Sequence, residues 1–186
     1  QDARTLAAGA PARAREGASS EALLKVLDAR LFALMQTGDP SEVIANGPSV
    51  AEIADAAGDM VRATRARTNT ASSMNLLGLF EDARALLDRA LTDARDRRMR
   101  ILEASALHNL GMSEARLGLV DRGLEMQREA GRIADETGAA RLRVNCRLYE
   151  ALLLLWRYAL ARAEGRASSS DASDLNAAQA LAAFVQ

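Results

Sequence analysis

Side chains that could carry out chemistry are few in this chain of 186 residues, and they do not cluster. His108 is the only histidine, and the ordinary pKa of its ring would let it titrate near neutral pH. It is not accompanied by a second histidine, a cysteine or a spaced pair of carboxylates, so the sequence predicts no metal site. Cys146 is the only cysteine and so cannot form a disulfide within the chain; its apolar helix predicts a small buried residue that reacts slowly.

Motifs for catalysis are missing as well. The chain has no nucleophile elbow, no glycine-rich phosphate-binding loop and no paired-histidine motif. We therefore expect a protein that is not an enzyme, with no catalytic residue and no cofactor.

Charge and hydropathy argue against two classes of partner. The formal net charge is −1, and arginines in residues 62–67 and 95–100 are interleaved with acids such as Asp93 and Asp96. This pattern favours solvated faces or ion pairs between helices over a nucleic-acid stripe. No run of about eighteen apolar residues would span a membrane, and no signal-peptide pattern is present. We expect a cytoplasmic protein and, since the chain starts at Gln1, a fragment or processed piece of a longer one.

A spacing of forty residues recurs along the chain. Gly38, Gly78 and Gly118 follow it, each just after an apolar helical run. Two series of small residues keep the same step: Ala54, Ala94 and Ala134, and Ala83, Gly123 and Ala163. Such a period indicates stacked supersecondary units, each of which buries its apolar face only against its neighbours. The small residues would let helices approach closely.

These units must be helical. The chain is 49% hydrophobic but only 3% aromatic, and no run alternates apolar with polar residues as a half-buried strand would. The sequence predicts an all-α solenoid of stacked antiparallel helix pairs, with about four repeats and a C-terminal capping helix. Its organisation would be a flexible leader over residues 1–19, repeats over 20–167, and a break followed by a cap over 168–186. Leu175, Ala178, Leu181, Ala182 and Val185 would share the buried face of that cap.

Start and stop signals place the helices. Order should begin at the N-cap Ser20, and the sequence from Asp39 to Glu42 predicts a strong helix start after Gly38. Gly47 and Pro48 predict that this second helix is broken. Later helices should run from about Asp59 to Leu77 and from Phe80 to about Arg97. The helix after these should end at Leu117, and the following one at about Thr137. Tyr158 stands where a fourth glycine would fall, so the turn there should be altered.

The sequence over about residues 20 to 167 resembles the tetratricopeptide repeat family, in its longer variety of bacterial regulators and kinesin light chains. The resemblance rests on a Leu-Gly pair, a short acidic turn and small residues at fixed offsets. In the third repeat the small positions match Gly111, Gly123 and Ala130. Glu114 and Gln127 depart from it, because they replace large apolar side chains.

The resemblance implies that first helices line a concave groove that binds an extended peptide or a partner helix. In many members an asparagine two residues before the small position bonds the peptide backbone; here Asn69 and Asn109 match it. The alternative is that these amides bond their own helix or face water. Tyr149 takes the same position in repeat four. Arg65 and Arg116 would face the groove and suggest a carboxylate in the ligand, unless they are only solvated. His108 and Met112 complete the expected groove.

We interpret the chain as a protein–protein interaction module from a larger bacterial regulatory or signalling protein. One alternative is a structural scaffold that self-associates through an exposed end or groove and binds no peptide. Another is the sensor portion of a multidomain kinase or nucleotide-driven switch whose chemistry lies outside these residues.

Overall fold

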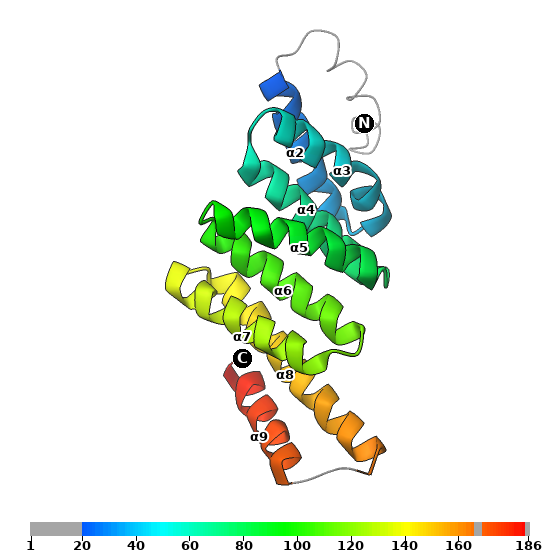
Figure 1. The fold of residues 1–186 in the computed structure, drawn as a ribbon, viewed down its shortest axis with the longest axis vertical. Helices are drawn as coiled ribbons and strands as arrows, with labels where there is room; N and C mark the ends of the chain where they lie inside the picture. The colour runs from blue at the N-terminus through cyan, green and yellow to red at the C-terminus, as the bar shows by residue number, and fades with distance from the viewer. Residues whose placement is uncertain (1–19, 166–168, 185–186) are drawn as a thin grey trace.

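All regular structure in the described part of the chain, residues 20–165 and 169–184, is helical in the computed structural model (Figure 1). The helices are α2 (Ser20–Thr37), α3 (Pro40–Ala56), α4 (Met60–Leu76), α5 (Phe80–Asp96), α6 (Arg100–Arg116), α7 (Val120–Thr137), α8 (Ala140–Ala163) and α9 (Ser169–Phe184). The predicted boundaries from α4 to α7 are confirmed to within a residue or so. The expected leader, residues 1–19, lies outside the described residues.

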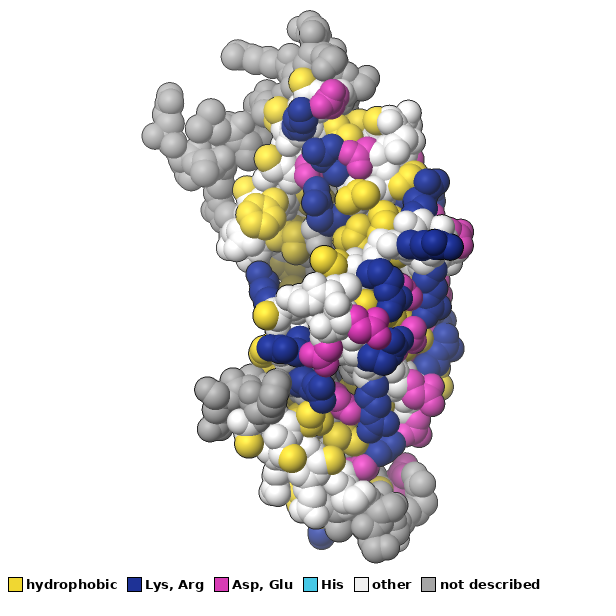
Figure 2. Space-filling view, turned by 90° about the vertical axis from the view of Figure 1, so that its left-hand side faces the viewer, with side chains coloured by type: hydrophobic (Ala, Val, Ile, Leu, Met, Phe, Trp, Pro, Cys, Tyr) yellow, Lys and Arg dark blue, Asp and Glu magenta, His cyan; other side chains and the backbone are white. Residues whose placement is uncertain are grey.

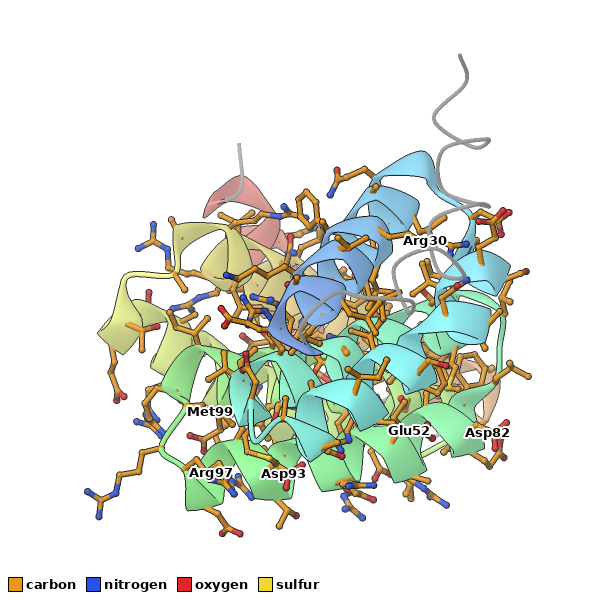
Figure 3. All side chains as sticks on the ribbon, turned by 90° about the horizontal axis from the view of Figure 1, so that it is seen from above. Arg30, Glu52, Asp82, Asp93, Arg97 and Met99 are labelled. Atoms are coloured by element: carbon orange, nitrogen blue, oxygen red, sulfur yellow. The ribbon has the colours of Figure 1, made fainter. Side chains whose placement is uncertain are left out.

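The unit behind the forty-residue spacing is a single helix and its turn, twenty residues long. Helices α3 to α6 each have 17 residues, and the turn after each of them contains a residue with positive φ: Gly58, Gly78, Arg98 and Gly118. Gly38 after α2 and Gly138 after α7 extend this series at the same step of twenty. Glycine suits such positions because it has no Cβ. Arg98 adopts this backbone with φ 55°, in the turn between Arg97 and Met99 (Figure 3).

Helix α3 corrects one prediction. It runs unbroken through Pro48, although proline removes one backbone donor from the helix. Pro48 is exposed, while Val43 and Val50 on either side of it are buried in the core, so packing holds both halves in one helix. Gly47 is buried for a different reason: a Cβ there would lie 1.9 Å from Thr70 Oγ1 of α4. The pair Gly47–Pro48 therefore permits close packing rather than a break.

The helices form a solenoid of antiparallel pairs stacked along the long axis, from α2 at one end to α9 at the other (Figure 1). Among the described residues, the first helices of successive pairs contact each other, α2 with α4, α4 with α6 and α6 with α8. The backbones of the second helices α3, α5 and α7 pack only against their sequence neighbours, and the second helices meet one another through long charged side chains, Arg89 with Asp55 and Arg95 with Glu129. The first helices therefore form a continuous inner layer, and the fold class predicted from the sequence is confirmed.

The core is built largely from alanine and leucine. Ala54, Ala94 and Ala134, one of the forty-residue series, are all buried, as are Ala83 and Gly123 of the second. Ala163, the last member, is exposed, so the close helix contact predicted there is absent. The reason is that α8 does not turn at Tyr158 but continues to Ala163, with a total length of 24 residues.

Helix α9 packs against α8 and supplies the second helix of the fourth pair. It begins at Ser169, so the serine-rich segment expected to be a break is largely helical. Ala178 is buried, and Leu175 and Leu181 are partly buried, as predicted for a shared face. The side chain of Ala182 and the whole of Val185 lie outside the described residues.

Candidate functional site

The inner layer presents side chains in register, because first helices repeat at forty-residue steps. Positions at the same height on α4, α6 and α8 are partly or largely exposed. They are Arg65, Ser105 and Asn145; Asn69, Asn109 and Tyr149; Ser72, Met112 and Leu152; and Leu76, Arg116 and Trp156. We call the solvent-facing side of these helices the inner face.

A cleft of about 530 Å³ opens on the inner face, between the C-terminal ends of α4 and α6 and the middle of α8. We call it the α4–α6–α8 cleft. Its apolar walls include Leu76, Phe80, Met112, Leu152 and Trp156, and Tyr149 lies beside them. Leu76 is 71% exposed and Leu152 is 48% exposed, so much apolar surface is open to solvent here.

Three of the residues expected in the groove meet in this cleft: Met112, Arg116 and Tyr149. The guanidinium carbon of Arg116 lies 5.3 Å from the centre of the Trp156 ring, in a cation–π contact. Arg116 makes no ion pair within the described part of the chain. Trp156 was missed by the sequence analysis, although its place forty residues after Arg116 is a signal that could have found it.

Arg65 and Asn69 lie elsewhere on the inner face. They line a separate depression of about 370 Å³ between α2 and α4, beside Phe32. Arg65 Nη2 lies 2.5 Å from Asp28 Oδ2, and Arg62 Nε lies 3.5 Å from the same oxygen. Arg65 was expected to pair with a carboxylate of the ligand. In the structure, Asp28 of α2 supplies the carboxylate that pairs with Arg65.

Asn109 bonds its own helix, as the alternative interpretation held. Its Nδ2 donates to the carbonyl of Ser105 at 2.9 Å. Its own carbonyl accepts from Nδ2 of Asn75 at 3.0 Å, and Asn75 Oδ1 accepts from Ser113 Oγ at 2.8 Å. Asn75 thus joins α4 to α6 below the cleft. The sequence analysis missed it, although its forty-residue counterpart is Ala115 and the change to a polar residue was visible.

His108 does not line the groove as expected, because its side chain is only 7% exposed. Its Nδ1–H donates to Gln127 Oε1 at 2.8 Å, and Gln127 Nε2 donates to the His108 carbonyl at 2.8 Å. The ring meets Tyr149 edge-to-face at 5.0 Å between centroids. Burial lowers the pKa of His108, and the Gln127 hydrogen bond opposes this only in part. The contact with the buried His108 ring therefore restrains the side chain of Tyr149.

This pairing explains a departure from the family pattern. Gln127 is buried where a large apolar side chain was expected, and both ends of its amide are bonded to His108. Cys146 is buried beside them, with Sγ 3.8 Å from His108 Nδ1. Burial raises the pKa of the Cys146 thiol to about 12, which agrees with the slow reactivity predicted for it.

Charge is divided between the two sets of helices. The first helices α2, α4, α6 and α8 carry formal net charges of 0, +3, 0 and +4, whereas α3, α5 and α7 carry −3, −2 and −2. Ion pairs cross the boundary, as predicted. The buried Arg67 of α4 pairs with Asp55 of α3 and lies 3.0 Å from Asp93 of α5.

Figure 2 shows basic and acidic side chains next to one another over the middle of the molecule. In the view along the stack, Asp82 and Asp93 lie along α5 at one edge, and Arg30 lies on α2 at the opposite side (Figure 3). The charges of the first helices make the inner layer more basic than the chain's net charge of −1 indicates.

A scan of protein-family models and a search of curated proteins both end without a match to this chain. Among the described residues, no helix has the length and apolar character needed to cross a membrane.

Proposed function

We propose that this chain is a tetratricopeptide-like interaction module without enzymatic activity, which binds a peptide segment of a partner protein on its inner face. The observation that carries the proposal is the α4–α6–α8 cleft, about 530 Å³ with mainly apolar walls, open on the inner layer of a solenoid. Extended inner surfaces of this kind are where helical-repeat proteins bind their partners. The cleft supplies apolar contact, and polar groups along the first helices supply direction.

The two asparagines contribute unequally to this proposal. Asn109 already donates to Ser105, which leaves its Oδ1 to accept a hydrogen bond from a peptide N–H. Asn69 is partly exposed and has no hydrogen bond within the described residues, so its whole amide is available to a peptide group. We therefore expect Asn69 to matter more than Asn109 for holding a ligand backbone.

The test compares two exposed leucines of the same helix. Leu152 lies in the cleft and is 48% exposed, while Leu160 lies outside it on α8 and is 41% exposed. Partners captured by the wild-type chain should be lost with Leu152→Asp and kept with Leu160→Asp. Equal capture by both variants would contradict the proposal. Each captured partner is then purified and titrated directly.

Two further measurements separate the alternatives. Light scattering at several concentrations would reveal a self-associating scaffold as a mass that rises with concentration. The double variant Asn69→Ala and Asn109→Ala should retain its helical signal and lose roughly tenfold in affinity for the purified partner, since two neutral hydrogen bonds are removed. Unfolding of the double variant would instead assign the asparagines to the fold.

A further inference from the structure

We propose, building on the function above, that the occupant of the α4–α6–α8 cleft is a partner segment with a bulky apolar side chain next to an acidic one. The apolar side chain would enter the cleft, and the acidic one would meet Arg116 at its rim. This assigns a chemical class to the partner: an acidic-apolar peptide within a protein.

The apolar half of the proposal follows from the walls of the cleft. Leu76, Met112 and Trp156 come from three different helices and face one space of about 530 Å³. Tyr149 is held beside this space by its contact with the buried His108 ring. A wall fixed in this way favours a large side chain, because little ordering remains to be done on binding.

The acidic half follows from charge complementarity. Among the described residues, the lining of the cleft contains Arg116 but no aspartate or glutamate. The acids of α6 and α8 lie near arginines of second helices instead. Glu103 of α6 pairs with Arg95 of α5, Glu114 lies 3.4 Å from Arg122 of α7, and Glu150 of α8 pairs with Arg128 of α7. Within the described part of the chain, Arg116 is thus a cation without an acidic partner, next to an apolar space.

The geometry of Arg116 sharpens this match. The cation–π contact with Trp156 restrains the guanidinium, and a planar guanidinium can bond a carboxylate with two of its nitrogens. Trp156 lies on α8 at the position that Leu76 takes on α4 and Arg116 on α6, so the forty-residue register places the ring beside the end of α6. The neighbouring first helix therefore supplies the wall that Arg116 contacts.

A carboxylate fits this site better than a nucleic acid backbone. A phosphate chain requires several available cations in a row. The other arginines near the inner face are largely matched by acids, as Arg62 and Arg65 are by Asp28 and Arg67 by Asp55. Among the described residues, the basic surface beside the cleft is therefore small and centred on Arg116, which suits one acidic side chain.

The test selects ligands from a phage-displayed library of short random peptides, using the wild-type chain, Arg116→Gln and Leu152→Asp. The wild type should enrich peptides with aspartate or glutamate beside phenylalanine, tryptophan, leucine or isoleucine. Synthetic copies are then titrated by fluorescence, because Trp156 is the only tryptophan and reports directly on the cleft.

Arg116→Gln should weaken a selected peptide by roughly tenfold to a hundredfold, as expected for loss of a charge-assisted hydrogen bond. Changing the peptide's acid to its amide should have the same effect on the wild type and little effect on Arg116→Gln. Raising the salt concentration should weaken only the acidic peptide. Circular dichroism confirms that each variant is folded.

The possible failures are distinguishable. Peptides that lack acids but are lost with Leu152→Asp would overturn this inference and leave the proposed function standing. Absence of enriched peptides, or peptides indifferent to Leu152→Asp, would overturn both. A single-stranded oligonucleotide that changes Trp156 fluorescence in the wild type but not in Arg116→Gln would replace the acidic peptide with a phosphate ligand.

Discussion

In the α6–α7 pair two glycines face each other, whereas in the α8–α9 pair the helices are joined by charge. A Cβ on Gly123 would lie 2.7 Å from the backbone oxygen of Gly111, and a Cβ on Gly111 would lie 2.9 Å from that of Gly123. In the last pair, Arg157 of α8 instead donates to both oxygens of Asp174 in α9, at 2.8 and 2.7 Å. Arg157 also lies 2.6 Å from Asp121 at the start of α7.

The two pairs show two ways of fixing one helix against the other within a pair of the same solenoid. Backbone contact at glycine brings helices together by removing side-chain volume, and it tolerates no added atom. The charged contact works through longer side chains, so it does not need a small residue at the crossing. The fourth unit keeps its second helix through this contact together with the apolar packing of Ala178 and Leu181, although the forty-residue pattern of small residues ends at Ala163.

The largest expected effect is at the glycine contact. Gly123→Ala should destabilise the chain by about 3 kcal/mol, because the backbone of α6 must move to admit the methyl group. Gly131→Ala in the same helix is the matched control. Its Cβ would meet only Cys146, at 3.5 Å, so the better helix propensity of alanine should stabilise the chain by about 0.5–1 kcal/mol. Urea unfolding of both variants measures the difference, and similar values would refute a steric role for Gly123.

A smaller loss is expected at the charged contact. Arg157→Gln should destabilise α9 by about 1–2 kcal/mol, because Asp174, 8% exposed, loses its partner, although solvent still reaches the pair. Arg162→Gln on the same helix is the control, since Arg162 has no acidic partner among the described residues and contacts Tyr158 through its hydroxyl and its ring. The melting temperature of the Arg162→Gln variant should equal that of the wild type. The idea fails if hydrogen exchange in α9 is unchanged by Arg157→Gln.

The α6–α7 pair should also respond to pH through His108. Its pKa is lowered by burial, so the unfolded chain binds a proton more readily than the folded one. The resulting stability is complete above the unfolded pKa of about 6.5 and is lost as the pH falls below it, by up to about 1.4 kcal/mol per pH unit. His108→Gln, which does not titrate, should show a shallower decline in unfolding free energy between pH 7 and 5.5. Identical slopes would exclude His108 as the cause.

The smallest effect concerns the turns between helices. Arg98→Gly should stabilise the chain by about 0.5–1 kcal/mol, because relief of the left-handed backbone exceeds the added entropy of the unfolded state. Gly118→Ala, at the next turn, should change the midpoint of thermal unfolding in the opposite direction. Two shifts of the same sign would show that φ at these turns does not control stability.

Local features of the fold were predictable because they depend on near neighbours in the chain. The glycine turns, the start at Asp39 and Pro40, and the change at Tyr158 all follow from local backbone preferences. Asp39 indeed caps α3, accepting from the backbone N–H groups of Ser41 and Glu42. The residues that take equivalent positions on successive first helices were also predictable, since the forty-residue period relates Asn109 of α6 to Tyr149 of α8. Pro48 shows the limit, because burial of Val43 and Val50 overrides a local signal for a break.

The sequence by itself determined the helices, their pairing and which residues recur at the same height. Only the tertiary structure decided what each of these residues meets. Arg65 and Arg116 look alike in the repeat, yet Arg65 is matched by Asp28 from α2 while Arg116 rests on Trp156 from α8. The physical reason is that a period describes one helix relative to its copies, whereas charge matching and burial depend on side chains from the adjacent helix. That difference turns one of two similar arginines into a candidate for ligand binding.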